Sequence, residues 1–275
     1  MSGLGPERLS LNTATVRERW NLSQCIDGCV RHGFGGIAPW RDKLQEMGTS
    51  AAARSIRDAG LEVTGVCRGG WFTENGVLDA EVLDENRRAV DEAEEIGAAC
   101  LVMVVGGLSA DSRDLPAAWR LVEDGLAATL EYARTAGVKI AIEPLHPMYA
   151  ADRACVNTMR QALDICDRLG EGIGCAVDVY HVWWDSELDS QIARAGSDRL
   201  LAFHICDWLV PTRDMLTDRG MMGDGVIDIP RLRCMVEQNG FSGLNEVEIF
   251  SELDWWRRDP DEVLGTIAER ARTAC

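Results

Sequence analysis

The sequence contains no run of about 18 apolar residues, the shortest stretch that is read as a membrane-spanning helix. Its first ten residues, MSGLGPERLS, also lack the charged and then apolar layout of a signal peptide. We therefore expect a cytoplasmic protein with no membrane partner.

Positive charge is scarce relative to negative charge. The chain has 28 Lys and Arg residues against 45 Asp and Glu residues, which gives a formal net charge of -17. A charge of this sign and size repels nucleic acid and anionic membrane surfaces, and it does not favour multiply phosphorylated substrates. We expect no nucleic-acid partner.

The ten cysteines lack the spacing of a disulfide framework or of a zinc site. Cys25 and Cys29 lie four residues apart on an expected helix, and no second pair completes a metal site. Cys100, Cys175 and Cys206 lie in apolar runs, where thiols behave as small hydrophobic groups. Reduced and mainly structural cysteines are therefore expected.

No Ser- or Pro-rich linker and no shift in composition divides the chain, so we expect a single domain over residues 1–275. Apolar strand patterns alternate with helical patterns at about 34 residues per unit. The expected strands are 8–15, 35–40, 62–68, 100–105, 140–142, 174–178, 200–206 and 243–250. The expected helices are 22–32, 49–60 with Thr49 as its N-cap, 80–96, 116–137, 157–169, about 188–195, 230–239 and 260–273.

This rhythm is typical of a (β/α)8 TIM barrel, an α/β fold. A doubly wound parallel sheet would alternate in the same way. However, no GxGxxG sequence follows the first expected strand, where a dinucleotide-binding sheet would carry it. The pattern therefore favours the barrel.

Four consecutive expected strands, the fifth to the eighth, each end near an acid or an imidazole. These residues are Glu143, Asp178, His204 and Glu248, at spacings of 35, 26 and 44. Barrel strands bring their carboxyl ends to one face, so the four side chains should converge. Three carboxylates at one point repel one another unless a cation lies between them. Oxygen-rich ligands with one nitrogen favour one divalent ion, with Mn²⁺ as the first choice and Mg²⁺ or Co²⁺ as alternatives.

The segments IEP, VDxYH, FHxxD and EVEIF around these residues resemble the metal-site motifs of a known family. It is the sugar phosphate isomerase/epimerase superfamily, whose members are xylose-isomerase-like TIM barrels, and the resemblance spans nearly the whole chain. It implies that Glu143, Asp178, His204 and Glu248 bind the metal ion. It also implies that Glu143 and Glu248 move the substrate proton.

The same resemblance implies substrate-binding residues. His181 matches a histidine that contacts substrate oxygens, and Asp207 can take the place of an acid three residues after the strand-seven histidine. The related epimerases also carry an arginine soon afterwards. The nearest one here is Arg213, which lies beyond an inserted-looking VPT segment.

His146 lies outside the four-ligand pattern. It is either a catalytic acid or base that faces the substrate or a loop histidine bonded to the backbone. Seven of the nine tryptophans follow expected strand ends: Trp40, Trp71, Trp183, Trp184, Trp208, Trp255 and Trp256. Trp40, Trp71 and Trp184 are the candidates for substrate contact, because flat rings suit sugar C–H faces. Loop packing or an oligomer interface is the alternative.

We expect a divalent-metal-dependent sugar isomerase or epimerase that removes a proton next to a keto-sugar carbonyl. A metal ion that chelates the carbonyl and a neighbouring hydroxyl would stabilise the resulting enediolate, with a carboxylate or histidine as base. The alternative is a lyase that uses the same chemistry. It would be a C-glycoside deglycosidase acting on 3-keto-C-glycosides, favoured by His146 and the tryptophans, or an inosose dehydratase-like elimination.

The expected partner is a small-molecule sugar, in a homo-oligomer or, for a deglycosidase, in a hetero-oligomer with a small β-rich subunit. The acidic, Gly-rich stretch 214–228 suits an ordered lid or a partner-binding loop. An endonuclease of this fold would need many histidines and a basic groove, and four histidines with a charge of -17 argue against it. A barrel without catalytic activity is disfavoured because no ligand of the metal set is missing.

Overall fold

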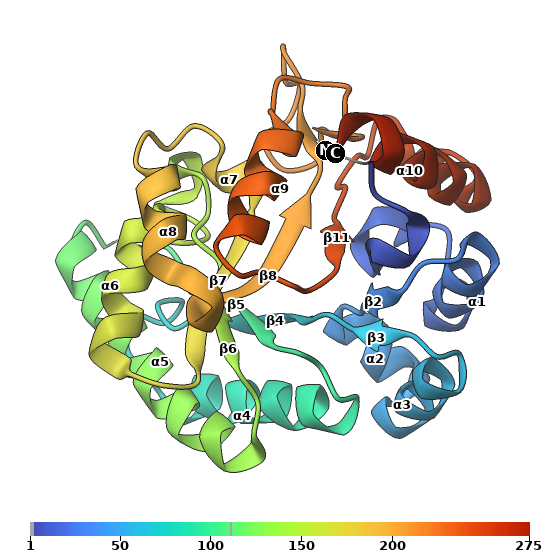
Figure 1. Ribbon diagram of the computed structural model, residues 1–275. Helices are drawn as coiled ribbons and strands as arrows, with labels where there is room; N and C mark the ends of the chain where they lie inside the picture. The colour runs from blue at the N-terminus through green and yellow to red at the C-terminus, as the bar shows by residue number, and fades with distance from the viewer. Residues whose placement is uncertain (1–2, 111) are drawn as a thin grey trace.

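One parallel sheet lies at the centre of the computed structural model, which describes residues 3–110 and 112–275 (Figure 1). Its strand segments follow the order β3-β2-β1-β11-β8-β7-β6-β5-β4. Their bounds are β1 Leu9–Asn12, β2 Gly36–Ala38, β3 Glu62–Val63, β4 Val66–Gly70, β5 Leu101–Val104, β6 Ile140–Ile142, β7 Ile173–Asp178, β8 Leu200–Ile205 and β11 Asn245–Val247.

The two ends of this order meet in the chain itself. β3 pairs with β2 and β4 pairs with β5, yet only Thr64 and Gly65 separate β3 from β4. Trp40, just past β2, also forms a parallel bridge with Cys67 of β4. The two segments are therefore one interrupted strand that brings the sheet close to full closure, and the predicted (β/α)8 barrel is confirmed. The assignment of residues 1–275 to one domain stays a prediction.

Helices surround the strands, and the last of them lies beside the first described residues, where Leu4 N donates to Ala271 O at 3.0 Å (Figure 1). Their bounds are α1 Leu22–His32, α2 Arg41–Met47, α3 Thr49–Asp58, α4 Ala80–Glu95, α5 Leu115–Ala136, α6 Met159–Leu169, α7 Val179–Val182, α8 Leu188–Arg199, α9 Ile229–Gln238 and α10 Pro260–Ala274. In the described part of the chain, no helix combines the length and the apolar character needed to cross a membrane. The cytoplasmic location stays a prediction.

Two expected boundaries differ from the structure for local reasons. Thr49 is the first residue of α3 and not its N-cap. The N-cap is Gly48, which makes the turn from the unexpected helix α2 into α3 with a φ of 85°. The first strand ends at Asn12 rather than at residue 15, since residues Thr13–Val16 form a 3-10 turn, η2. The Asn12 side chain accepts a hydrogen bond from Ala14 N at 3.0 Å, which ends the strand with this side chain inside the barrel.

Small side chains fill the interior of the barrel below the carboxyl ends of the strands. This inner cluster consists of Cys67, Cys100, Val102, Ala141, Ala176 and Ala202. Burial raises the pKa of the Cys100 thiol to about 12, so it stays protonated at neutral pH. All ten cysteines, which lie within residues 3–110 and 112–275, are free thiols. Small residues here leave room for longer polar side chains above them.

Candidate active site

The four predicted metal ligands lie together at the carboxyl ends of their strands. Asp178 is the last residue of β7, His204 is the penultimate residue of β8, and Glu143 and Glu248 directly follow β6 and β11. All four are buried. Each offers one ligand atom such that these atoms lie within 4.8 Å of one another.

The orientation of His204 fits a metal ligand. Its Nδ1 lies 3.0 Å from Glu143 Oε1 and 4.0 Å from Glu248 Oε2, so this nitrogen faces the cluster. The opposite nitrogen, Nε2, lies 3.5 Å from Oε1 of Glu246. Histidines that bind metals through one ring nitrogen usually direct the other toward a carboxylate or carbonyl. Three carboxylates and one imidazole also form a donor set that suits a divalent cation.

Glu246 and Asn12 form a network behind the ligands that the sequence analysis missed. Asn12 Nδ2 donates to Glu246 Oε1 at 2.7 Å and to Glu248 Oε1 at 2.9 Å. Trp40 Nε1 in turn donates to Asn12 Oδ1 at 2.9 Å, and Thr64 Oγ1 donates to Glu246 Oε2 at 2.8 Å. The network therefore fixes the predicted ligand Glu248. It also fixes the Glu246 carboxylate, which lies beside a second predicted ligand, His204.

Arg219 brings positive charge into the same cluster. Only 3% of the residue is exposed, and it lies in β10 (Arg219–Gly220), which pairs in antiparallel fashion with β9 (Asp207–Trp208). Its Nη1 donates to Asp178 Oδ2 at 2.9 Å and to Glu248 Oε2 at 3.0 Å. Its Nη2 lies 3.2 Å from His181 Nε2. The hairpin thus carries a cation to the centre of the site.

Arg213, which the resemblance suggested for substrate contact, lies elsewhere. Its side chain is 51% exposed and forms an ion pair with Asp218 inside the loop. It does not line the cavity described below, so the structure gives the buried position to Arg219 instead. The loop reaches the site by folding back on itself, which is why the nearest arginine in sequence is not the nearest in space.

The charges of the cluster are unbalanced without a further cation. Burial raises the pKa of Glu248, Arg219 opposes the rise and the Glu143 carboxylate adds to it, and the net result is a pKa of about 8. Burial lowers the pKa of His204, but the Glu246, Glu143 and Glu248 carboxylates outweigh this effect and hold it well above its usual value. The raised pKa of His204 shows that carboxylates outweigh cations around it, and a divalent ion would neutralise this negative charge.

His181 is neutral at neutral pH because burial lowers its pKa to about 3. Its Nδ1 accepts a hydrogen bond from the backbone N–H of His146 at 3.2 Å. In the neutral ring the proton therefore sits on Nε2, which faces Arg219 Nη2. These two donors cannot satisfy each other, so together they are suited to hold one oxygen acceptor.

A cavity of about 240 Å³ reaches the cluster, and Glu143, His181, Arg219 and Glu248 are among the residues that line it. An outer chamber of about 720 Å³ shares part of its wall with the inner cavity. Trp40 lines both spaces, and Trp71 lines the outer one. Two of the three tryptophans expected at the substrate therefore lie on the approach to the cluster.

The third, Trp184, lines neither of these two spaces and contacts His146. The His146 ring stacks on Trp208 at a centroid distance of 5.1 Å and meets the edge of Trp184 at 5.6 Å. Its Nδ1 accepts a hydrogen bond from Met148 N at 3.3 Å. His146 is not part of the lining of the inner cavity, and this arrangement matches the alternative of a loop histidine bonded to the backbone.

Asp207 anchors the loop and does not reach the cavity. Its two carboxylate oxygens accept hydrogen bonds from the backbone N–H groups of Trp208, Gly223, Gly225 and Ile227 at 2.8–3.0 Å. These bonds occupy the carboxylate and hold the two ends of the loop together. The expectation that Asp207 contacts substrate therefore has no support in its position.

Comparisons with known proteins agree on one fold family. Residues 26–267 match a family described as the xylose isomerase-like TIM barrel. Inosose isomerase from Bacillus velezensis is 24% identical over 275 residues, which cover 95% of this chain and 95% of that protein. A crystal structure of a protein from Sinorhizobium meliloti 1021 is 58% identical, with a TM-score of 0.95 and 98% of each chain covered. A crystal structure of an IolI protein with a bound zinc atom is 20% identical, with a TM-score of 0.77 and 95% of each chain covered.

Proposed function

Because this chain belongs to the xylose isomerase-like TIM barrel family, we propose that it is a divalent-metal-dependent sugar isomerase or epimerase. It would move a proton on the carbon next to a keto-sugar carbonyl. The observation that carries the proposal is the convergence of Glu143, Asp178, His204 and Glu248, whose ligand atoms lie within 4.8 Å of one another, with Glu143 and Glu248 reaching the cavity.

Those four residues would hold the metal ion, and a bound divalent ion would make the C–H bond beside the carbonyl more acidic. The zinc atom in the IolI structure supports a divalent ion in this chain as well. Mn²⁺ stays our first choice, with Mg²⁺ and Co²⁺ as alternatives, because oxygen donors dominate the set.

Glu143 and Glu248 would move the proton. Both line the cavity, and they come from β6 and β11, which β7 and β8 separate in the sheet. The two carboxylates, from strands that are not neighbours, would approach a bound substrate from different sides. One takes the proton and the other returns it, which is the arrangement that inversion at one carbon requires.

Arg219 and His181 would bind the substrate oxygens. Arg219 Nη2 and His181 Nε2 are donors 3.2 Å apart at the cavity wall, so a substrate oxygen between them would accept from both. The negative charge that develops on that oxygen during proton removal strengthens both hydrogen bonds. The backbone N–H of His146 serves this function indirectly because it fixes the tautomer of His181.

A lyase that uses the same proton removal is the second candidate. Trp40 and Trp71 on the approach to the site suit a flat group attached to the sugar. His146 was the other argument for a C-glycoside deglycosidase. Its ring packs against Trp184 and Trp208, so this argument is weaker than the one from the tryptophans. The isomerase or epimerase is therefore the better-supported proposal. A homo-oligomer, or a β-rich partner subunit for a lyase, stays a prediction.

Incubation of the metal-loaded protein with keto-sugars and 3-keto-glycosides in D₂O tests this proposal. NMR should show deuterium at the carbon next to the carbonyl, together with an isomer or epimer of the starting sugar. Release of the attached group instead would establish the lyase. Absence of deuterium uptake across the panel, from protein with a full complement of metal, would refute both.

A further inference from the structure

Four arginines line the inner cavity of a chain whose net charge is -17: Arg17, Arg68, Arg153 and Arg219. Two of them are already neutralised within the protein. Arg219 pairs with Asp178 and Glu248, and Arg17 pairs with Asp42 at 2.9 Å. Within residues 3–110 and 112–275, no carboxylate lies within ion-pair distance of Arg68 or Arg153, so these two cations are not neutralised.

The same contrast holds in the outer chamber. Its wall contains Arg41 and Arg88, which both pair with Glu85, and Arg41 pairs with Glu92 as well. Arg68 lies where the two spaces join and lines both. The positive charge that no carboxylate of the described residues neutralises therefore lies on Arg68, where the two spaces join, and on Arg153 in the inner cavity.

The structure holds Arg68 in place without a carboxylate. Its Cζ lies 4.5 Å from the centroid of the Trp71 ring and 5.7 Å from that of Trp40. Trp71 is the one non-glycine residue of the described chain with a positive φ, 58°, a conformation that costs backbone strain. Such strain is retained where it serves a purpose, and here it places an aromatic face against the guanidinium of Arg68.

The environment of Arg68 disfavours an isolated cation. Burial lowers the pKa of Arg68, and the charges of Arg153 and Arg17 lower it further, although Cys67 and Glu143 oppose this. A half-buried cation beside two others is unfavourable unless an anion joins them. Arg153 reaches the same cavity from the loop after β6, with its Cζ 5.7 Å from the Tyr149 ring. The two free guanidinium groups thus face one space from different elements.

We infer that the substrate of this site carries one anionic group, a carboxylate or a phosphate, which binds between Arg68 and Arg153. This inference rests on the proposed function, which assigns the carbonyl end of the substrate to the metal-ligand cluster. It narrows the substrate class to acidic keto-sugars. The planar guanidinium fork binds carboxylate and phosphate oxygens two at a time. Two free arginines, in a cavity that Glu143 and Glu248 also line, suit a single anionic group and disfavour a polyphosphate.

A comparison of three substrates tests the inference through turnover. They are a ketohexose, its 6-phosphate ester, and the ketohexuronate in which the same carbon is a carboxylate. We expect kcat/KM for deuterium exchange to be at least tenfold higher for one acidic form than for the ketohexose, and the preferred form identifies the anion. Each of Arg68→Met and Arg153→Met should lower that value about 10- to 100-fold through KM, the loss of one charge-assisted hydrogen bond.

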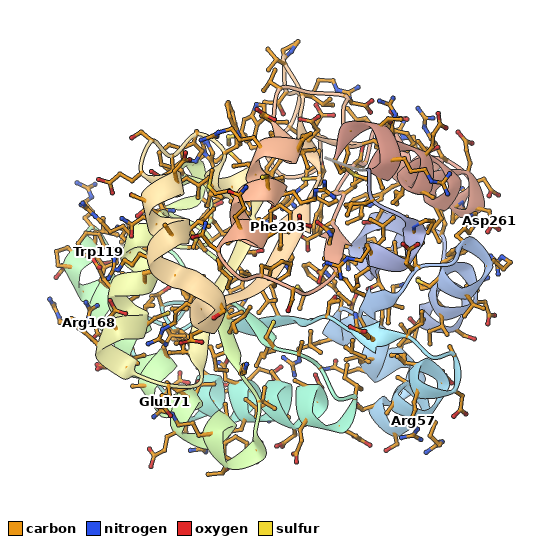
Figure 2. The ribbon with its side chains drawn as sticks, viewed as in Figure 1. Arg57, Trp119, Arg168, Glu171, Phe203 and Asp261 are labelled. Atoms are coloured by element: carbon orange, nitrogen blue, oxygen red, sulfur yellow. The ribbon has the colours of Figure 1, made fainter. Side chains whose placement is uncertain are left out.

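Arg57→Met is the matched control, because Arg57 projects from α3 on the outer surface (Figure 2). It should leave all three values unchanged. In the Arg68 and Arg153 variants, the fold-decrease in kcat/KM should be at least tenfold smaller for the ketohexose than for the preferred acidic substrate. Equal losses on neutral and acidic substrates, or equal kcat/KM for all three in the unaltered protein, would overturn the inference.

A binding measurement separates this inference from the proposed function, because it needs no turnover. Glucitol, glucitol 6-phosphate and gluconate lack the carbonyl and can be titrated by calorimetry. We expect one acidic polyol to bind at least tenfold more tightly than glucitol, and Arg68→Met and Arg153→Met each to abolish that difference. Arg68→Lys, which keeps the charge without the fork, should retain part of it. If the acidic polyols show no preference while keto-sugars still exchange deuterium, the proposed function stands and the anion site is wrong.

Discussion

Glu246→Gln tests how the protein prepares the metal site without altering a ligand. Glu246 is buried, with Oε1 2.7 Å from Asn12 Nδ2 and 3.5 Å from His204 Nε2, and Oε2 2.8 Å from Thr64 Oγ1. Glutamine can keep its carbonyl oxygen toward Asn12 and His204. Its amide group then donates to Thr64, whose hydroxyl can donate to Ser10 Oγ at 2.7 Å. The substitution therefore removes the charge and preserves the hydrogen bonds.

The size of the effect follows from the orientation of His204. A carboxylate on the far nitrogen of a ligating histidine increases its basicity, and the loss of such a partner costs 10- to 100-fold in metal affinity. This corresponds to about 1.4–2.7 kcal/mol of binding free energy. Because the side-chain volume and the hydrogen bonds stay the same, unfolding free energy without metal should change by less than about 1 kcal/mol.

Titration of Mn²⁺ into metal-free protein by calorimetry measures this effect, with circular dichroism as the check on folding. Glu252→Gln, at an exposed position in the loop after β11, is the matched control and should bind Mn²⁺ as the unaltered protein does. Unchanged Mn²⁺ affinity in a folded Glu246→Gln protein would refute the idea that Glu246 tunes His204. Loss of affinity in the control as well would show that the effect is general and not local.

Three further outcomes are expected. Purified protein should contain about one divalent ion by elemental analysis, and Glu143→Ala should lose it; a stable and active protein that binds no Mn²⁺ would contradict the site. Glu248→Gln should keep some metal but lose deuterium exchange about 10²–10⁴-fold, and near-normal turnover would show that Glu248 is only a ligand. His146→Ala should cost about tenfold or less in exchange, because its ring lies between Trp184 and Trp208. A loss of about 10²–10⁴-fold in the His146 variant, with metal still bound, would instead support the lyase.

The parts of the fold that the sequence predicted are those with a regular hydrophobic pattern. The bounds of α1, Leu22–His32, match the expected helix, and a capping box at Asn21 and Gln24 begins it. The helix α2 was missed because only Leu44 of its seven residues is buried, so it has no apolar face to recognise. The strand from Glu62 was expected to be continuous, but closure of the barrel interrupts it at Thr64 and Gly65.

The candidate site was predictable to the extent that strand ends carry it. Glu246 could have been found in the same way, because it lies on β11 two residues before Glu248, and both carboxylates accept from Asn12 Nδ2 on the same side. Arg219 could not, since its position depends on the pairing of Arg219 with Trp208 and Gly220 with Asp207 inside an aperiodic loop. That pairing is a tertiary event, and no local periodicity in residues 207–228 indicates it.

Net charge shows a related limit of composition. A charge of -17 describes the field far from the protein, and that field governs the approach of polyanions such as nucleic acid. Salt screens such a field within about 8 Å, so recognition inside a cavity depends on the groups that line it. Arg68 and Arg153 lie in that wall without a carboxylate partner among the described residues. An acidic protein can therefore keep a binding site for an anion, provided that the cavity separates its arginines from the acidic outer surface.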